Sequence, residues 1–281
     1  MLPIRHLASL CSSVWFASVV ACAHPTPSRA AAGPTGTNDA GGAPSSGSGA
    51  ASVGGASAVF PATVTRPRLL IVGDSISAGP GCYKKYLLER LTSHGYSKLE
   101  FVGEYTDDCG GGVRHGAVSC STAEQLTQPT FTMPNCAQGK SFPGMATLVA
   151  THQPDLVLLQ LGVNDVWNGK SPRQVLGWYS TLVERARASN PRIAVVVAQI
   201  AKIRPDCTNA AVAAAADALV AAVPAWARGI DTVESRVLVA DLWTNSDWSK
   251  AETNDCVHPN DAGARKMASN WFDALAPLLP K

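Results

Sequence analysis

The sequence predicts a three-layer α/β/α sandwich built around a five-stranded parallel sheet. Five apolar runs of strand length alternate with helical patterns, and two of the runs, 155–162 and 192–200, are apolar on both alternations. Alternating strands and helices imply right-handed crossovers and parallel pairing. Runs that are apolar on both sides indicate strands covered on both faces of the sheet.

The elements follow one another without a break in the pattern. The predicted strands are 69–72, 98–103, 155–162, 192–200 and 236–242, and the predicted helices are 84–94, 145–152, 171–189, 208–227 and 260–279. Ser171 followed by Pro172 is a favourable helix start. Five strands suit a flavodoxin-like arrangement, in which the functional site lies at the carboxyl ends of the strands.

The N-terminal part of the chain lies outside this pattern. Arg5 and His6 precede an apolar run, 7–21, that is too short to span a bilayer comfortably and ends in small residues. We therefore expect residues 1–21 to be a bacterial secretory signal. "VVAC", ending at Cys22, resembles the lipobox of bacterial lipoprotein signals, whose cysteine carries the lipid. "ACA" also satisfies the rule for ordinary cleavage, so secretion without an anchor is the alternative.

A tether and one folded domain follow the signal. Residues 22–65 consist mainly of Ala, Gly, Ser, Pro and Thr, which bury too little apolar surface to offset their ordering entropy. We expect a disordered linker there and a single domain over 66–281. The net charge of +2, without long charged blocks, argues against a nucleic-acid groove or a polybasic membrane patch.

The cysteines indicate disulfides. Of eight cysteines, Cys11 and Cys22 precede the domain, which leaves six: Cys82, Cys109, Cys120, Cys136, Cys207 and Cys256. An even number in an exported domain predicts three disulfides, whose pairing the sequence leaves open. A zinc site is disfavoured because no Cys-x-x-Cys pair occurs. We expect Cys256 to pair with Cys207, since their loops share one face of the sheet.

The segment 104–143 has no sustained periodicity and contains three of these cysteines. Loops of this length in compact domains are usually functional or disordered. Because cysteines are available to pin it, we expect an ordered loop near the substrate.

Polar residues with catalytic chemistry follow the predicted strands. Ser75 stands in "GDSIS" after the first, Asn164 in "GVND" after the third, and Asp255 and His258 in "NDCVHPN" after the fifth. A serine hydroxyl needs a base to take its proton, and a His held by an Asp supplies one. The N–H groups of Ser75 and of Gly144, in "SFPGMAT", and the Asn164 amide are candidate oxyanion donors.

These four blocks, in this order, resemble those of the SGNH (GDSL-type) hydrolases over residues 68–265. The resemblance implies a flavodoxin-like fold, no metal or cofactor, and ester hydrolysis with Ser75 as nucleophile, His258 as base and Asp255 as its orienting acid. Ser75, Gly144 and Asn164 would form the oxyanion hole. "FVGEY" and "VHPNDAG" look most like secreted carbohydrate acetyl esterases of the acetylxylan-esterase type. The α/β-hydrolase elbow is excluded because it needs glycine at position 77, which is Ser77.

The expected substrate is therefore a short acyl ester, such as an acetylated polysaccharide. A lipase or lysophospholipase acting on lipid esters is one alternative, and a carbohydrate-binding surface protein without turnover is another. Trp167, Trp243 and Trp248 are equally consistent with a substrate pocket and with core packing. Asp74 and Asp165 are expected to hold the loops around the site.

The lipid anchor can be tested by fractionation. Cys22→Ser removes the predicted lipidated thiol, so we expect the protein to move from the membrane fraction to the soluble fraction. Cys11→Ser is the matched control, because Cys11 lies inside the apolar run. Unchanged fractionation of Cys22→Ser would refute the anchor.

Overall fold

The computed structural model describes residues 59–281 apart from residues 62, 80, 108, 134, 135, 245, 247 and 250. The predicted signal (1–21), Cys22 and the linker up to residue 58 lie outside the described residues.

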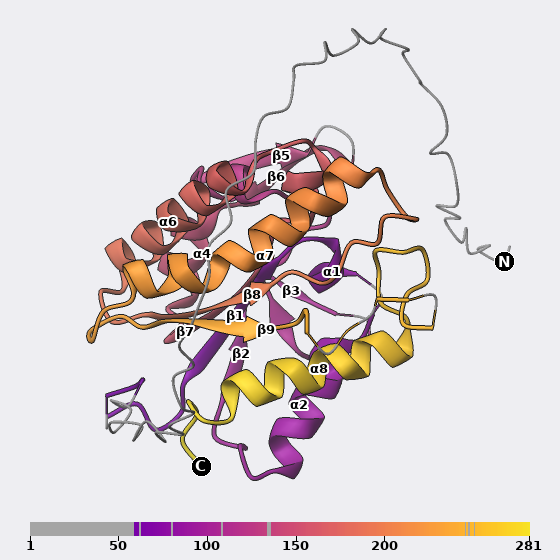
Figure 1. Cartoon of the computed structure of the whole chain (residues 1–281). Coiled ribbons are helices and arrows are strands. Elements are labelled where there is room, and N and C mark those ends of the chain that lie inside the picture. The colour runs from indigo at the N-terminus through magenta and orange to yellow at the C-terminus, as the bar shows by residue number, and fades with distance from the viewer. Residues whose placement is uncertain are drawn as a thin grey trace, which may run out of the picture. The chain divides into compact units, whose positions relative to one another are not determined.

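The centre of the fold is a five-stranded parallel sheet in the order β2-β1-β7-β8-β9 (Figure 1). Its strands are β1 (Arg68–Gly73), β2 (Glu100–Val102), β7 (Leu156–Gln160), β8 (Ala194–Gln199) and β9 (Val237–Asp241). The predicted fold class is confirmed. This order is the flavodoxin-like one, whose direction of winding reverses between the first and third strands, here β1 and β7. Ligand sites of such sheets lie at that switch point.

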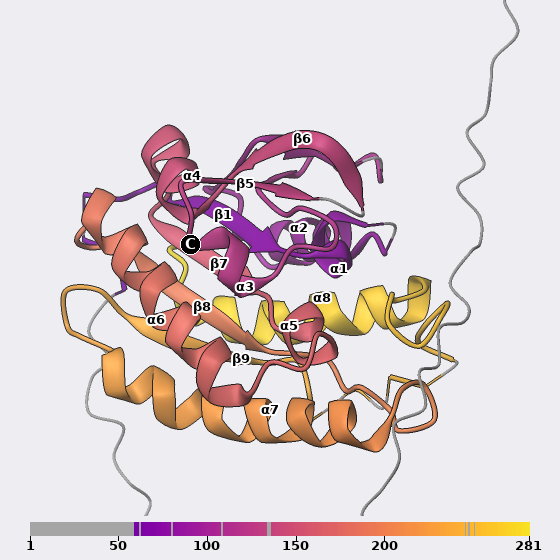
Figure 2. The same ribbon diagram turned by 90° about the horizontal axis from the view of Figure 1, so that it is seen from above.

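Helices cover both faces of the sheet. Helices α2 (Tyr83–Ser93) and α8 (Asp261–Leu275) pack together on one face. On the other face, α6 (Pro172–Ser189) packs between α4 (Met145–His152) and α7 (Ala210–Ile230), and Figure 2 shows α6 and α7 side by side. The predicted start of α6 is confirmed, because the Ser171 side chain caps the helix with Gln174.

The apolar runs of the sequence form the buried strands of the core. Every residue of β7 is buried, as is every residue of β8 except Gln199. Of the described helices, α7 alone is long and apolar enough to span a membrane by composition. It packs against α6, β8 and β9 through an apolar face that includes Leu219 and Val223, which is the setting of a core helix.

The segment 104–143 contains more regular structure than its sequence predicts. It forms two small antiparallel pairs and one helical turn: β3 (Tyr105–Thr106) with β4 (Arg114–His115), α3 (Ala123–Leu126), and β5 (Thr130–Met133) with β6 (Ala137–Pro143). The disulfide Cys82–Cys109 attaches this segment to the start of α2, and Cys120–Cys136 closes a loop within it. Most of these strands are too short to show a period, so the sequence did not reveal them.

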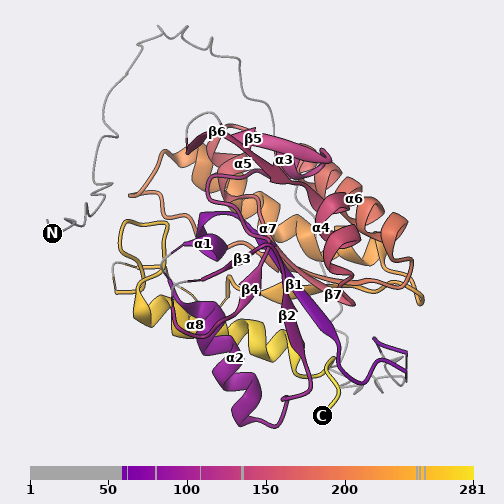
Figure 3. The same ribbon diagram turned by 180° about the vertical axis from the view of Figure 1, so that it is seen from behind.

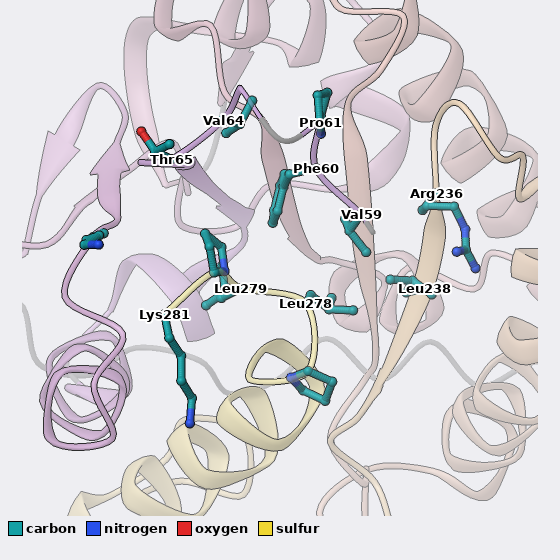
Figure 4. Close-up of a pocket in the computed structure, with 13 residues that line it drawn as sticks. Val59, Phe60, Pro61, Val64, Thr65, Arg236, Leu238, Leu278, Leu279 and Lys281 are labelled. Carbon is teal, nitrogen blue, oxygen red and sulfur yellow. The ribbon is translucent and has the colours of Figure 1, made fainter. Parts of the chain in front are cut away.

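The predicted linker ends earlier than residue 65. Phe60 is 8% exposed and packs with Val59 and Val64 against the apolar core. Figure 4 shows these residues facing Leu278 and Leu279 of the C-terminal tail across a cavity of about 490 Å³. Phe60 and Val64 give this stretch the apolar surface that the rest of the linker lacks.

A buried ion pair lies beneath the turn after β1. The side chains of Lys84 and Asp107 are 0% and 2% exposed, and Lys84 Nζ lies 3.6 Å from Asp107 Oδ2. The same ammonium donates to the backbone carbonyl of Ser77. Burial lowers the pKa of Lys84, and the Asp107 charge opposes that shift. The pair therefore links the segment 104–143 to α1 (Ser75–Ala78).

Two buried carboxyl groups hold the turns at the switch point, as predicted for Asp74 and Asp165. Asp74 caps α1, since its Oδ1 accepts from the Ile76 N–H at 3.0 Å. Both oxygens of Asp165 accept from the Ala123 N–H at 3.0–3.1 Å. Burial raises the pKa of Asp74 to about 7 and that of Asp165 to about 6, although the backbone donors act in the opposite direction.

The raised pKa of Asp74 predicts how stability depends on pH. The folded-state value of about 7 exceeds the ordinary value of 3.8, so unfolding releases the proton between these values and stability falls as the pH rises through them. That difference in pKa corresponds to about 4 kcal/mol. Asp74→Asn keeps a capping oxygen but cannot ionise. Its stability relative to wild type should therefore rise by up to that amount between pH 4 and 7.

Urea unfolding with the disulfides intact measures this difference. Asp217→Asn, an exposed position on α7, is the matched control and should follow wild type at every pH. If Asp74→Asn and wild type lose stability in parallel, the Asp74 carboxyl is not held protonated by burial.

Candidate active site

Ser75 is the first residue of the short helix α1, which follows β1 in the chain. Figure 3 shows where these two elements lie. Its side chain is half-buried, and its N–H occupies the first helical position, where no intrahelical acceptor exists. Gly73 permits this tight turn, because a Cβ there would lie 2.8 Å from the Gln160 carbonyl oxygen and closer still to Ser77. The turn therefore presents the Ser75 hydroxyl at the carboxyl edge of the sheet.

The structure brings Asp255, His258 and Ser75 into one hydrogen-bonded chain. Asp255 Oδ2 lies 2.8 Å from His258 Nδ1, and His258 Nε2 lies 2.9 Å from Ser75 Oγ. An ionised carboxylate only accepts, so Nδ1 carries the proton and Nε2 accepts from the serine hydroxyl. This is the tautomer in which a histidine can take the proton of a serine nucleophile.

The turn before His258 orients Asp255 as well. Asp255 Oδ1 accepts from the backbone N–H groups of His258 at 2.8 Å and Val257 at 3.1 Å. Burial alone would raise the pKa of the Asp255 carboxyl, but these N–H donors and the His258 ring outweigh it and lower the pKa below its ordinary value. Asp255 therefore stays ionised beside His258.

The loop that carries this pair is pinned from several sides. The predicted disulfide between Cys207 and Cys256 is confirmed. The indole N–H of Trp248 donates to the Val257 carbonyl at 3.1 Å, and the Asn254 N–H donates to the His258 carbonyl at 2.9 Å. Trp248 is 3% exposed, so of its two predicted roles it mainly packs the loop onto the core.

Of the predicted side-chain and glycine oxyanion donors, Asn164 has a hydrogen available and Gly144 does not. Asn164, on α5 (Val163–Trp167), is half-buried, and its Nδ2 donates to the Ser121 carbonyl at 2.9 Å, which leaves its second amide hydrogen available. Gly144 does not fit the prediction. Its N–H donates to the Pro129 carbonyl at 2.9 Å, and it caps α4 behind residues 126–128. Gly144 was predicted to be a donor from its position before a predicted helix, but its N–H is already hydrogen-bonded to the backbone.

Two hollows adjoin the site. One is a very small apolar cavity of about 10 Å³. Its lining includes Ile76, Val163, Trp167, Ile203, Trp248 and Val257. A larger cleft, of about 310 Å³, lies among Ala78, Tyr105, Ser119, Lys140 and Phe142. Among the described residues, no three His, Cys, Asp or Glu side chains gather as a metal site requires.

Some functional groups could not be recognised in the sequence. His115 is buried in β4, and burial together with the Lys84 charge lowers its pKa to about 4. Lys84 is fully buried in α2, although lysine side chains are rarely buried. Its only sequence signal is its place two residues after Cys82, whose disulfide brings Asp107 close.

Known proteins with similar sequences and structures indicate the family of this chain. The model of the GDSL-like Lipase/Acylhydrolase family matches residues 71–266. A multidomain esterase of Ruminococcus flavefaciens is 26% identical over 233 residues, which are 75% of this chain but 29% of that relative. The chain thus spans under a third of that protein.

Two solved structures are similar in fold and sequence. A crystal structure of an acetyl esterase mutant, with acetate ion, and one of a carbohydrate esterase family 3 protein from Talaromyces cellulolyticus both match with TM-score 0.63 and 26% identity. Each match covers 75% of this chain and 97% of the other. By its fold, its ordered sequence blocks and the match over 71–266, this chain belongs to the GDSL-like lipase/acylhydrolase family of ester-hydrolysing enzymes.

Proposed function

We propose that this chain is an exported serine esterase that removes short acyl groups, chiefly acetyl, from polysaccharide. The observation that carries the proposal is the hydrogen-bonded chain Asp255–His258–Ser75. A serine within 2.9 Å of a correctly oriented imidazole is the arrangement that acyl transfer needs. A protein that only binds carbohydrate has no use for it.

The reaction follows from this geometry in two halves. Ser75 Oγ attacks the ester carbonyl carbon while His258 Nε2 takes the hydroxyl proton, and the imidazolium is stabilised by Asp255. The tetrahedral intermediate collapses, the C–O bond to the alcohol breaks, and His258 returns the proton to that oxygen. Water then attacks the Ser75 acyl ester with the same base, and the carboxylic acid leaves.

The negative oxygen of each intermediate needs donors fixed in advance. The Ser75 N–H and the free hydrogen of the Asn164 amide are the predicted donors that the structure leaves available. Removal of one such donor typically costs about 3 kcal/mol of transition-state stabilisation. Because Ser121 fixes the Asn164 amide from the other side, this donor needs no reorganisation during the reaction.

The preference for a short acyl group rests on the small apolar cavity. Ile76 follows the nucleophile directly and Val257 precedes the base, and both line this cavity with Val163 from α5. A cavity of about 10 Å³ is close to the minimum that holds one water molecule, so it favours the smallest acyl group. A long acyl chain would have to displace Trp248, which is 3% exposed.

The larger cleft supports a carbohydrate leaving group. Tyr105 and Phe142 give it aromatic surface, while Thr106, Ser119 and Lys140 give it hydroxyl and ammonium donors. Ala78, one turn after Ser75 on α1, connects it to the nucleophile. The similarity to an acetyl esterase and a family 3 carbohydrate esterase points to the same substrate class.

Export is proposed from two independent features. Three disulfides join the six cysteines of the domain, and structural disulfides form in oxidising compartments outside the cytosol. The predicted signal and Cys22 provide the route, with the lipid anchor as the favoured outcome and free secretion as the alternative.

Hydrolysis of nitrophenyl esters over a range of chain lengths tests the activity. We expect the acetate to be preferred and Ser75→Ala to lose at least about a thousandfold in kcat, because the nucleophile is gone. Ser77→Ala, on the same helix but turned toward Tyr83 and Gln160, is the matched control and should retain turnover. A long-chain optimum would favour the lipase alternative, and a lack of turnover on both nitrophenyl esters and acetylated xylan would favour the binding protein.

The polysaccharide cleft has its own test. Tyr105→Ala removes an aromatic wall of the cleft, so KM for acetylated xylan should rise severalfold while kcat/KM for nitrophenyl acetate stays near wild type. Tyr86→Ala, on α2 beside Asp261 and outside the cleft, is the matched control. Equal losses on both substrates would show that Tyr105 supports the fold and does not bind sugar.

A further inference from the structure

Residues 118–121 form a tight turn against the end of β1. The Ser121 N–H donates to the Val118 carbonyl at 3.2 Å, which closes the turn. The Gly73 carbonyl accepts from the Val118 N–H at 2.9 Å and from the Ser121 hydroxyl at 3.2 Å. Since Gly73 lies two residues before Ser75, the turn is fixed directly beside the nucleophile.

The same turn is fixed to the end of β7. The Asn164 amide donates to the Ser121 carbonyl at 2.9 Å, and Asp165 accepts from the Ala123 N–H. The turn thus bridges the two strands of the switch point. Its central residues are Ser119 and Cys120. They lie between Val118, which is bonded to Gly73, and Ser121, which is bonded to Asn164.

Cys120 has an unusual backbone conformation for a residue with a side chain. Its φ is +65°, whereas Ser119 is not among the residues with positive φ. In a turn closed by a hydrogen bond from its fourth residue to its first, a negative φ at the second position and a positive φ at the third match a type II turn, whose third position is normally glycine. The closing bond uses the Ser121 N–H, so the Cys120 N–H takes no part in it.

That N–H has no acceptor within the described residues, and Cys120 itself is only partly exposed. It is therefore an unused donor in a turn that is hydrogen-bonded both to Gly73, two residues before Ser75, and to Asn164. Gly144, expected to be the third donor, is not available because its N–H is bonded to Pro129.

We propose that the backbone N–H of Cys120 is the third oxyanion donor, and that the Cys120–Cys136 disulfide holds it in place. The inference rests on the proposed serine esterase function and deepens it. A left-handed backbone disfavours a non-glycine residue by about tenfold or more, so an outside constraint must hold Cys120 there. The disulfide to Cys136, directly before β6, supplies it.

The arrangement also makes activity sensitive to reduction. Cys136 is exposed and lines the cleft with Ser119, so a thiol can reach this disulfide from the substrate side. Two-electron reduction by a dithiol gives two cysteine thiols and the oxidised reagent. The covalent constraint on Cys120 is then lost, and kcat should fall.

Two double variants separate the backbone conformation from the disulfide itself. Cys120→Gly/Cys136→Ala loses the bond but keeps a residue that readily adopts positive φ, so its kcat on nitrophenyl acetate should exceed that of the matching valine variant by about tenfold. Cys120→Val/Cys136→Ala loses the bond and favours negative φ, so its kcat should fall about tenfold or more with KM little changed. Near-UV circular dichroism checks that both variants fold. Equal kcat values would overturn the proposal.

The N–H itself is tested by a backbone ester. In the Cys120→Gly/Cys136→Ala protein, nonsense suppression with glycolic acid at position 120 replaces the N–H by oxygen and changes little else. We expect kcat to fall by about a hundredfold or more, as for other lost oxyanion donors. Glycolic acid at Gly112 is the matched control, since that exposed residue has φ +64° and a Cβ added to it would meet no atom within 4 Å.

An ester at position 120 that leaves kcat unchanged would exclude the Cys120 N–H from the oxyanion hole. That result would leave the proposed function intact, because wild type would still turn over and Ser75→Ala would not. If wild type itself had no esterase activity, the proposed function would fail first.

Discussion

The site depends on one hydrogen bond, between His258 Nε2 and Ser75 Oγ, which joins residues 183 positions apart in the chain. Ser75 is placed by the first strand of the sheet and His258 by the loop that follows the last one. The contact therefore forms only once the sheet has assembled in its β2-β1-β7-β8-β9 order. A shift of either loop by about 1 Å would take the imidazole out of reach of the hydroxyl.

Each side of that contact has its own support. Beneath Ser75, the capping carboxyl of Asp74 and the buried Lys84–Asp107 pair fix α1 from inside the protein. Around His258, the Cys207–Cys256 disulfide and Trp248 fix a loop whose Asp255 side chain is 57% exposed. Covalent and aromatic anchors suit a loop with little surface to bury, whereas buried polar groups suit a turn inside the core.

The sequence predicts those parts of the molecule that repeat a pattern over many residues. The five strands and the long helices show clear periods, and Ser75, Asp255 and His258 stand in short blocks of fixed spacing. Cys207 and Cys256 were paired correctly because the predicted sheet placed both loops on one face. The topology of the predicted sheet, more than the local sequence, made this pairing predictable.

The rest depends on contacts that no local pattern records. Gly144 was expected to be an oxyanion donor from its place before a helix, yet its N–H is bonded to Pro129, and the free N–H belongs to Cys120. A cysteine in a position that favours glycine is recognisable only once its φ and its disulfide are known. The burial of Lys84 and His115 likewise results from the packing of 104–143, most of whose strands are too short to predict.

In the proposed reaction, Ser75 carries the acyl group between the two halves. Rapid acid quenching during turnover of an acetyl ester, followed by peptide mapping, tests it most directly. We expect an acetyl group on the Ser75 hydroxyl, in the peptide that contains "GDSIS". An acetyl group on another side chain, or turnover with Ser75 never acylated, would contradict it.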